Sequence, residues 1–159
     1  MREILFRVCD VQKKVLANAT SIMWLSEDEV EIDHDKNGVR EPFQIHPDTA
    51  VLEQFTGLHD ATKWEDLTDA ERDEWIKSGH TKEDWNGKRI FEGDIVKHNN
   101  THFVVEFSAN HLGFICIDKK HKTRGGFANW RDGNWMKNVS SYLQIIGNIH
   151  DNPELLEAK

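Results

Sequence analysis

The feature that most constrains the fold is a series of short apolar segments, rich in β-branched and aromatic residues and separated by polar connections of hairpin length. In the second half of the chain these segments are residues 95–96, 103–107, 113–117 and 142–149. Short strands at near-regular spacing are typical of a small antiparallel barrel or sandwich. The sequence therefore predicts a mostly β fold, α+β in detail.

The N-terminal part continues this pattern. Residues 4–9, 15–25 and 30–33 are predicted strands, with Phe6 and Val8 on the buried face of the first. Asn37-Gly38 predicts a tight hairpin turn, because Asn-Gly tolerates positive φ. Pro42 and Pro47 predict an irregular connection, and the apolar residues 51–58 are expected to return to the core.

Residues 61–85 differ in composition from the rest of the chain: they include eight acidic and four basic residues and thus carry a net charge of −4. Thr68 and Glu71 form a capping box that predicts a helix start, and Gly79 is suited to its end. Thr81 and Asp84 predict a second short helical turn. We expect this helical insert to dock on the β body through its tryptophans.

Composition narrows the class of protein. A formal net charge of −8 in 159 residues argues against general binding to duplex nucleic acid or to an anionic membrane. No apolar run is long enough to span a bilayer, and the charged N-terminus lacks the apolar core of a secretion signal. Cys9 and Cys116 are outside any CxxC motif and are expected to be free thiols. We therefore expect a cytoplasmic protein.

Four segments in order resemble the YopX family of phage and prophage proteins. The opening segment is residues 4–14, with Arg7 and Asp10, and the second is Phe55-Thr56-Gly57-Leu58-His59-Asp60, which is similar to a YTGLKD-type motif. The most distinctive segment is residues 86–96, which includes Ile90-Phe91-Glu92-Gly93-Asp94. The closing segment is residues 146–153. The chain departs from the family at Cys9, where an aromatic residue is expected, and at the insert, where many members have a short turn.

The resemblance implies an SH3-like β barrel in the C-terminal half and supplies no catalytic residue, cofactor or ligand. The predicted organisation is an N-terminal β region at 1–60, the acidic helical insert at 61–85, the barrel region at 86–150 and a C-terminal tail at 151–159, which together can share one core. The tail is expected to form one helical turn with Pro153 at its first position.

Glu92 and Asp94 form the first candidate site, because carboxylates two residues apart on a strand project to the same side. Clustered carboxylates hold the cation of a metal-dependent nuclease, but the local sequence offers no third acid. The alternative, which we favour, is structural: Gly93 supplies an unusual backbone conformation and Asp94 accepts hydrogen bonds from turn amides.

A basic stretch with interleaved aromatic residues is the second candidate. Residues 115–137 carry six basic and two acidic residues, a local charge of +4. Such a segment suits single-stranded nucleic acid, which needs phosphate contacts and flat stacking surfaces; it equally suits a solvated loop whose aromatic residues cover the barrel. The residues concerned are Lys119, Lys120, Lys122, Arg124, Phe127, Trp130, Arg131 and Trp135.

The remaining candidates are histidines and tryptophans. His98 and His102 flank a turn, but two imidazoles fall short of a zinc site, so no metal site is predicted. Trp64, Trp75 and Trp85 lie among dense carboxylates and predict either a protein interface or a cap over one end of the barrel. The insert is also complementary in charge to the basic stretch of another copy, which would make a homo-oligomer.

We therefore expect a non-enzymatic phage or prophage accessory protein that acts through contacts with an unknown protein partner or with itself. A single-stranded nucleic-acid-binding module is the alternative, and a carboxylate-dependent enzyme is the least favoured class. No cofactor is expected.

Overall fold

The computed structural model describes residues 5–10, 15–24, 29–34, 40–44, 50–109, 113–120, 123–124 and 142–157. It is mostly β, with one short α-helix, as the sequence predicts. The elements in chain order are β1 (Phe6–Asp10), β2 (Val15–Trp24), β3 (Glu29–His34), β4 (Arg40–Gln44), β5 (Ala50–His59), η1 (Trp64–Asp66), α1 (Asp69–Lys77), η2 (Lys82–Asp84), β6 (Arg89–Phe91), β7 (Asp94–His98), β8 (Thr101–Ser108), β9 (Gly113–Asp118), β10 (Thr123–Arg124), β11 (Gln144–Asn148) and η4 (Pro153–Leu156).

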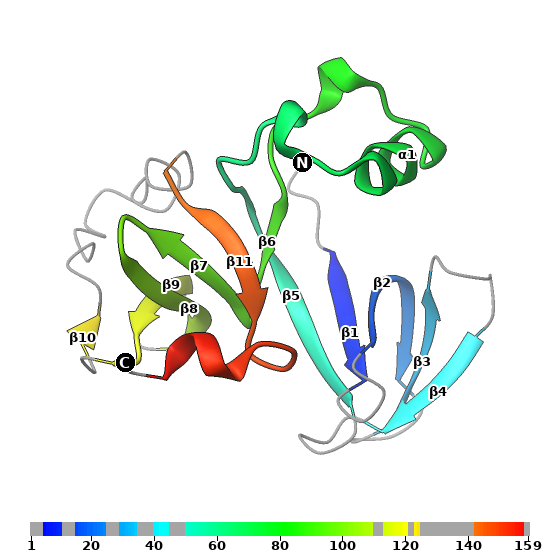
Figure 1. Ribbon diagram of the computed structural model, residues 1–159. Coiled ribbons are helices and arrows are strands. Elements are labelled where there is room, and N and C mark those ends of the chain that lie inside the picture. The colour runs from blue at the N-terminus through cyan, green and yellow to red at the C-terminus, as the bar shows by residue number, and fades with distance from the viewer. Residues whose placement is uncertain are drawn as a thin grey trace.

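Two antiparallel sheets lie side by side, and β5 and β6 form the side of the first sheet that faces the second in the view of Figure 1. The first sheet has the strand order β4-β3-β2-β1-β5-β6, and the second has the order β10-β9-β8-β7-β11. The described strands leave both sheets open. Closure of the second sheet into the SH3-like barrel that the resemblance implies is therefore not observed in the described part of the chain.

The chain crosses from one sheet to the other at a two-residue turn between β6 and β7. The amide of Glu92 donates to the carbonyl of Gln54 in β5 at 2.9 Å, whereas the amide of Gly93 donates to the carbonyl of Val105 in β8 at 2.8 Å. The backbone amides of two neighbouring residues thus bond to different sheets, and this turn sets the direction in which the chain passes from β6 in the first sheet to β7 in the second.

Apolar side chains from both sheets form one core cluster. Leu58 and Ile90 of the first sheet pack with strands β7, β8 and β9 and with the residue before β11. The buried members of this cluster are Ile90, Val96, Phe103, Val105, Cys116 and Leu143. The predicted strands at 95–96, 103–107, 113–117 and 142–149 all fall in or around observed strands because their apolar side chains supply this core.

Two local expectations need correction. The segment between Pro42 and Pro47 is predicted as an irregular connection, but its first residues belong to β4, which spans Arg40–Gln44. A proline is tolerated there because β4 is the edge strand of its sheet and needs fewer ladder donors. In β1, burial does not follow the predicted Phe6 and Val8 face: Phe6 is half-buried, whereas Val8 and the residues of the opposite face, Arg7 and Cys9, are buried. The turn predicted at Asn37-Gly38 lies outside the described residues.

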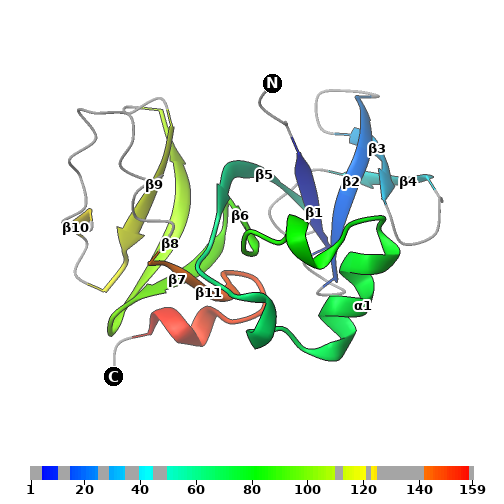
Figure 2. The same cartoon turned by 90° about the horizontal axis from the view of Figure 1, so that it is seen from above.

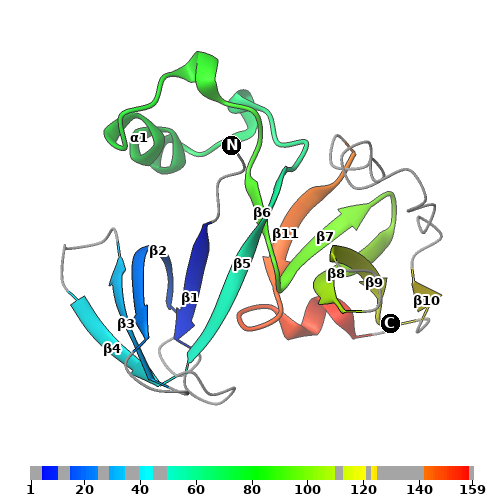
Figure 3. The ribbon, with the colours of Figure 1, turned by 180° about the vertical axis from the view of Figure 1, so that it is seen from behind.

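The helical insert at 61–85, hereafter the helical lobe, lies above the first sheet in Figure 1 and is seen from behind in Figure 3. The predicted capping box is confirmed, since the Glu71 amide donates to Thr68 Oγ1 at 3.3 Å and Thr68 N donates to Glu71 Oε2 at 2.8 Å. Gly79, with φ of 91°, follows the helix end, and η2 forms the predicted second turn.

Candidate functional site

Four charged or titratable side chains that lie far apart in the sequence meet between the sheets; we call them the buried junction. They are Arg7 from β1, Glu53 from β5, Asp94 from β7 and His150 after β11. Arg7 Nε lies 2.5 Å from Glu53 Oε2, and Arg7 Nη2 lies 2.7 Å from Asp94 Oδ1. His150 Nε2 lies 2.8 Å from Glu53 Oε1. Only 2–3% of the Glu53 and Asp94 side chains is exposed.

A glycine makes room for this junction. Gly93 has φ of 83°, a left-handed conformation that favours glycine. A Cβ at this position would overlap Glu53 Oε1. The bare backbone of Gly93 therefore lets the Glu53 carboxylate lie against the turn and reach both Arg7 and His150.

His150 is held in place by a polar turn at the end of β11. Asn148 Oδ1 accepts hydrogen bonds from the amides of His150 and Asp151 at 2.9 and 3.0 Å. Asn148 Nδ2 donates to Asp151 Oδ2 at 2.9 Å. The asparagine side chain thus replaces a regular turn hydrogen bond and directs the imidazole towards Glu53.

Burial and charge act in opposite directions on the ionisable groups. Burial raises the pKa of Asp94 to about 6, despite the opposing effects of the Arg7 guanidinium and of the Phe91 amide, which donates to Asp94 Oδ2 at 2.8 Å. Burial also raises the pKa of Glu92. For Arg7, burial disfavours the charged form, but the carboxylates of Asp94 and Glu53 outweigh it and raise the pKa. The guanidinium is therefore a permanent cation in this site.

The acids of the junction are engaged by groups of the protein itself. Each carboxylate oxygen of Glu53 and Asp94 has a partner within the protein. Glu92 contributes its backbone carbonyl, which accepts from Arg7 Nη2 at 3.3 Å. Within the described ranges, no three or more His, Cys, Asp or Glu side chains are grouped so that they could hold a metal ion.

A second polar anchor, Asp60, joins the end of β5 to the segments before β6 and in β11. Its Oδ1 accepts from the amides of Thr62 and Lys88 at 2.9 and 2.8 Å. Its Oδ2 accepts from Thr62 Oγ1 at 2.8 Å and from the Ile145 amide at 2.9 Å. Gly87 passes so close that a Cβ there would overlap the Asp60 carbonyl oxygen.

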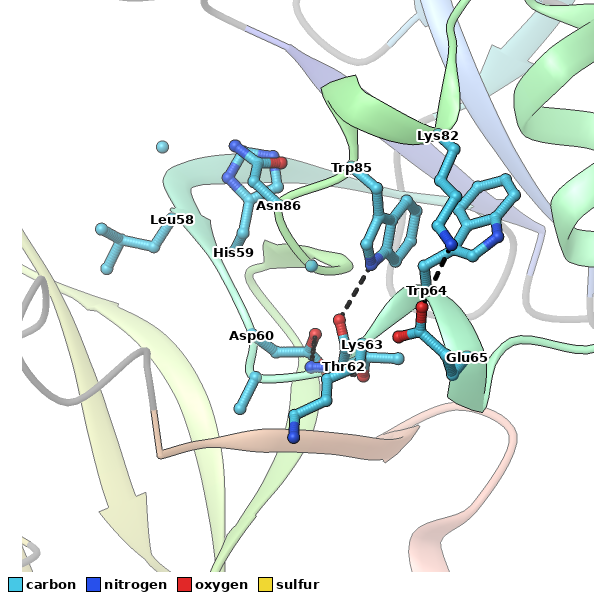
Figure 4. A pocket seen from close by; sticks show the side chains of 13 residues that line it. Leu58, His59, Asp60, Thr62, Lys63, Trp64, Glu65, Lys82, Trp85 and Asn86 are labelled. Atoms are coloured by element: carbon cyan, nitrogen blue, oxygen red, sulfur yellow. Dashed lines mark hydrogen bonds and ion pairs between the residues drawn. The ribbon is translucent and has the colours of Figure 1, made fainter.

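A hollow of about 620 Å³ opens between this anchor and the helical lobe (Figure 4). Trp85 stands in its wall and donates from Nε1 to the Thr62 carbonyl at 2.9 Å. Lys82 pairs with Glu65 at 3.3 Å across the rim. The lining residues are Gly57, Leu58, His59, Asp60, Ala61, Thr62, Lys63, Trp64, Glu65, Lys82, Trp85, Asn86 and Gly87. Many of the polar groups in this wall form hydrogen bonds or ion pairs within the protein. The lining therefore does not indicate which class of ligand could bind in the hollow.

The tryptophans of the helical lobe pack on one another. The ring centroids of Trp64 and Trp85 are 6.1 Å apart, and those of Trp75 and Trp85 are 5.1 Å apart. His80 stacks on Trp75 at 4.2 Å. None of the α1 residues is buried. The half-buried indoles thus pack on one another within the lobe, and the docking of the lobe on the β body through its tryptophans stays a prediction.

The basic stretch is described only at its beginning and in β10. Lys119 and Lys120 are exposed, and Lys119 pairs with Glu106. They border a second hollow, of about 400 Å³, beside the tail segment at η4. Of Arg124 only the backbone, in β10, is described. Lys122, Phe127, Trp130, Arg131 and Trp135 lie outside the described residues, so the nucleic-acid prediction stays a prediction.

The two candidate histidines do not form a common site. In the β7–β8 register His98 is opposite Thr101, and His102 is opposite Lys97. His98 contacts the ring of Tyr142 edge-on at 6.5 Å between centroids, while His102 Nδ1 lies 2.8 Å from the Leu155 carbonyl oxygen. His102 thereby holds the tail segment η4 against β8.

Sequence reasoning did not single out Arg7, Glu53, Asp60 or His150 as site residues. A signal was present, because Arg7 and Glu53 are charged residues inside apolar segments that were predicted to face the core. A charge in such a position must be paired when it is buried. The identity of the partner depends on strands far apart in the chain.

Residues 79–157 match the family model described as YopX protein. This part of the chain belongs to the YopX family. The YopX match spans η2 to η4 and includes Asp94 and His150, whereas Arg7 and Glu53 precede it.

Among solved structures, the chain is similar to the crystal structure of protein EF1440 from Enterococcus faecalis. The two are 21% identical, the TM-score is 0.53, and the alignment covers 99% of this chain and 100% of the other. At this identity the similarity shows the fold alone. No curated protein matched the chain significantly. In the described ranges, no helix has the length and apolar character needed to cross a membrane.

Proposed function

We propose that the protein is a non-enzymatic accessory protein of a phage or prophage that acts by binding another protein through its helical lobe. The observation that carries this proposal is that α1 buries none of its residues and turns an acidic, partly apolar surface to solvent. The lobe folds around its own tryptophans, so this surface is left for another molecule.

The exposed surface of α1 defines the kind of partner. Ile76 is 49% exposed, and Asp73 lies one helical turn before it. The side chains of Asp73 and Glu74 make no hydrogen bond or ion pair with the described residues. An apolar side chain beside unpaired carboxylates fits a partner with a basic rim around an apolar contact.

The proposal also assigns the buried junction a structural role, because its acids and its guanidinium are bound to one another. The SH3-like character of the second sheet, which the family resemblance implies, belongs to this proposal. In this arrangement the sheets hold the lobe in place and the lobe makes the contact.

Affinity capture from induced host cells tests this function. Tagged wild-type protein is compared with two lobe variants, D73K/E74K and I76S, and with Q144K as a control at an exposed position in β11. We expect one protein to be retained by the wild type and by Q144K and to be lost, or at least tenfold reduced, with both lobe variants. Capture should also weaken as salt concentration rises.

The same experiment distinguishes a protein that binds another protein from one that binds nucleic acid. Treating the lysate with nuclease should leave the captured protein in place; its loss would indicate binding through nucleic acid. Equal capture by all four proteins would contradict a contact through α1. Circular dichroism of each variant verifies that the helix is intact.

A further inference from the structure

The buried junction holds more negative than positive charge. Arg7 is shared by two carboxylates, since its Nε faces Glu53 and its Nη2 faces Asp94. One guanidinium thus faces two carboxylates, and these three ionised groups carry a net charge of −1. An unbalanced charge is costly in a site from which water is largely excluded, and one proton would balance it.

We propose that the junction is a proton-operated latch between β1, β5 and β7, in which Asp94 takes up a single proton in mildly acidic solution and thereby stabilises the contact. This inference is independent of the proposed function, because it concerns the packing of the sheets and not the surface of the lobe.

The groups around Asp94 come from every element packed against it. Arg7 faces it from β1, Glu53 from β5 and Glu92 from the preceding turn. His150 is linked to it through Glu53. Arg7 is the cation bound directly to the Asp94 carboxylate, and the nearby carboxylates add to the excess negative charge that favours proton uptake.

The direction of the effect follows from linkage. The pKa of Asp94 is raised in the folded protein from 3.8 to about 6, chiefly by burial. The stabilisation is therefore fully present below pH 3.8 and is lost as pH rises through about 6. Between pH 7.5 and 5.0 this single group should raise the ratio of folded to unfolded protein about tenfold.

Urea unfolding at pH 7.5, 6.0 and 5.0 tests the latch in the wild type and three variants. In D94N the site cannot titrate, so the tenfold gain on acidification should disappear, whatever the overall loss of stability. E71Q, which removes a carboxylate in the lobe, should keep the wild-type gain. H150Q, whose amide can still donate to Glu53, should also keep it.

Carbon-13 NMR of the Asp94 side-chain carboxyl in the wild type gives a second readout that needs no variant. A midpoint near pH 6 supports the latch, and a midpoint below 4.5 overturns it. The latch is equally overturned if D94N retains the gain, or if the gain is lost in H150Q, which would place the proton on the imidazole. If D94N does not fold, the NMR midpoint decides.

Discussion

Replacing Gly93 by alanine should destabilise the fold far more than an ordinary glycine substitution, because two separate costs fall on the same residue. The first is conformational: Gly93 has φ of 83°, which an L-residue with a side chain adopts with difficulty. The second is steric: the new Cβ would overlap the Glu53 carboxylate. Glu53 would have to leave Arg7 and His150 for the alanine to fit.

The magnitude follows from these two effects. The left-handed conformation costs about 1–2 kcal/mol for a non-glycine residue. Breaking a buried ion pair costs about 3–5 kcal/mol when one charge stays buried without its partner. Because the Glu53 side chain can relax partly, we expect Gly93→Ala to lower the free energy of unfolding by about 4 kcal/mol, a large part of the 5–15 kcal/mol typical of a domain.

Gly79→Ala is the matched control, because Gly79 has a similar φ of 91° and a Cβ there would meet nothing within 4 Å. It should cost only the conformational part, about 1 kcal/mol. Urea unfolding of both variants, followed by circular dichroism and by tryptophan fluorescence, gives the two free energies. Equal losses in the two variants would refute the role assigned to the Gly93–Glu53 contact.

Three further predictions concern other parts of the chain. Asp60→Ala should cost about 3 kcal/mol or more and speed hydrogen exchange at the Lys88 amide, since buried donors lose their acceptor; unchanged exchange would contradict the anchor. Trp85→Phe should lower the free energy of unfolding by about 1 kcal/mol in thermal unfolding, because it loses the hydrogen bond to the Thr62 carbonyl and keeps an aromatic ring. A loss of stability as large as that of Trp85→Ala would contradict this, because it would mean that the phenylalanine ring does not replace the packing of the indole. Burial raises the pKa of the Cys116 thiol to about 12, so an alkylating reagent at pH 8 should modify it only after unfolding, as mass spectrometry would show.

The parts of the fold that could be predicted depend on neighbours in the sequence. The start of α1 was predictable because Thr68 and Glu71, three residues apart, satisfy each other's backbone amides. The strands of the second sheet were predictable because apolar side chains recur in short runs. Pro42 misled the prediction, because its effect on a strand depends on whether that strand lies at the edge of the sheet.

The buried junction could not be predicted in the same way, because its contacts join distant parts of the chain. Arg7 and Glu53 are 46 residues apart, and Glu53 and His150 are 97 residues apart. Alternation along β1 predicted Arg7 on the less buried face. Arg7 and Cys9 on that face are in fact buried. In the view from above in Figure 2, β5 and β6 lie between β1 and the second sheet. Only the strand order places these side chains together.

The charged side chains of the junction are paired within the protein, whereas those of the helical lobe face solvent. Substitutions in the two places should therefore affect stability and binding separately. In the junction each carboxylate oxygen of Glu53 and Asp94 is bound within the protein, so a substitution there should change unfolding and leave the partner surface in place. In the lobe Asp73 and Glu74 face solvent without a described partner, so their reversal should change binding and leave unfolding almost unaltered. A variant set drawn from both places therefore distinguishes loss of a contact from loss of the fold, which a binding assay on junction variants alone would not do.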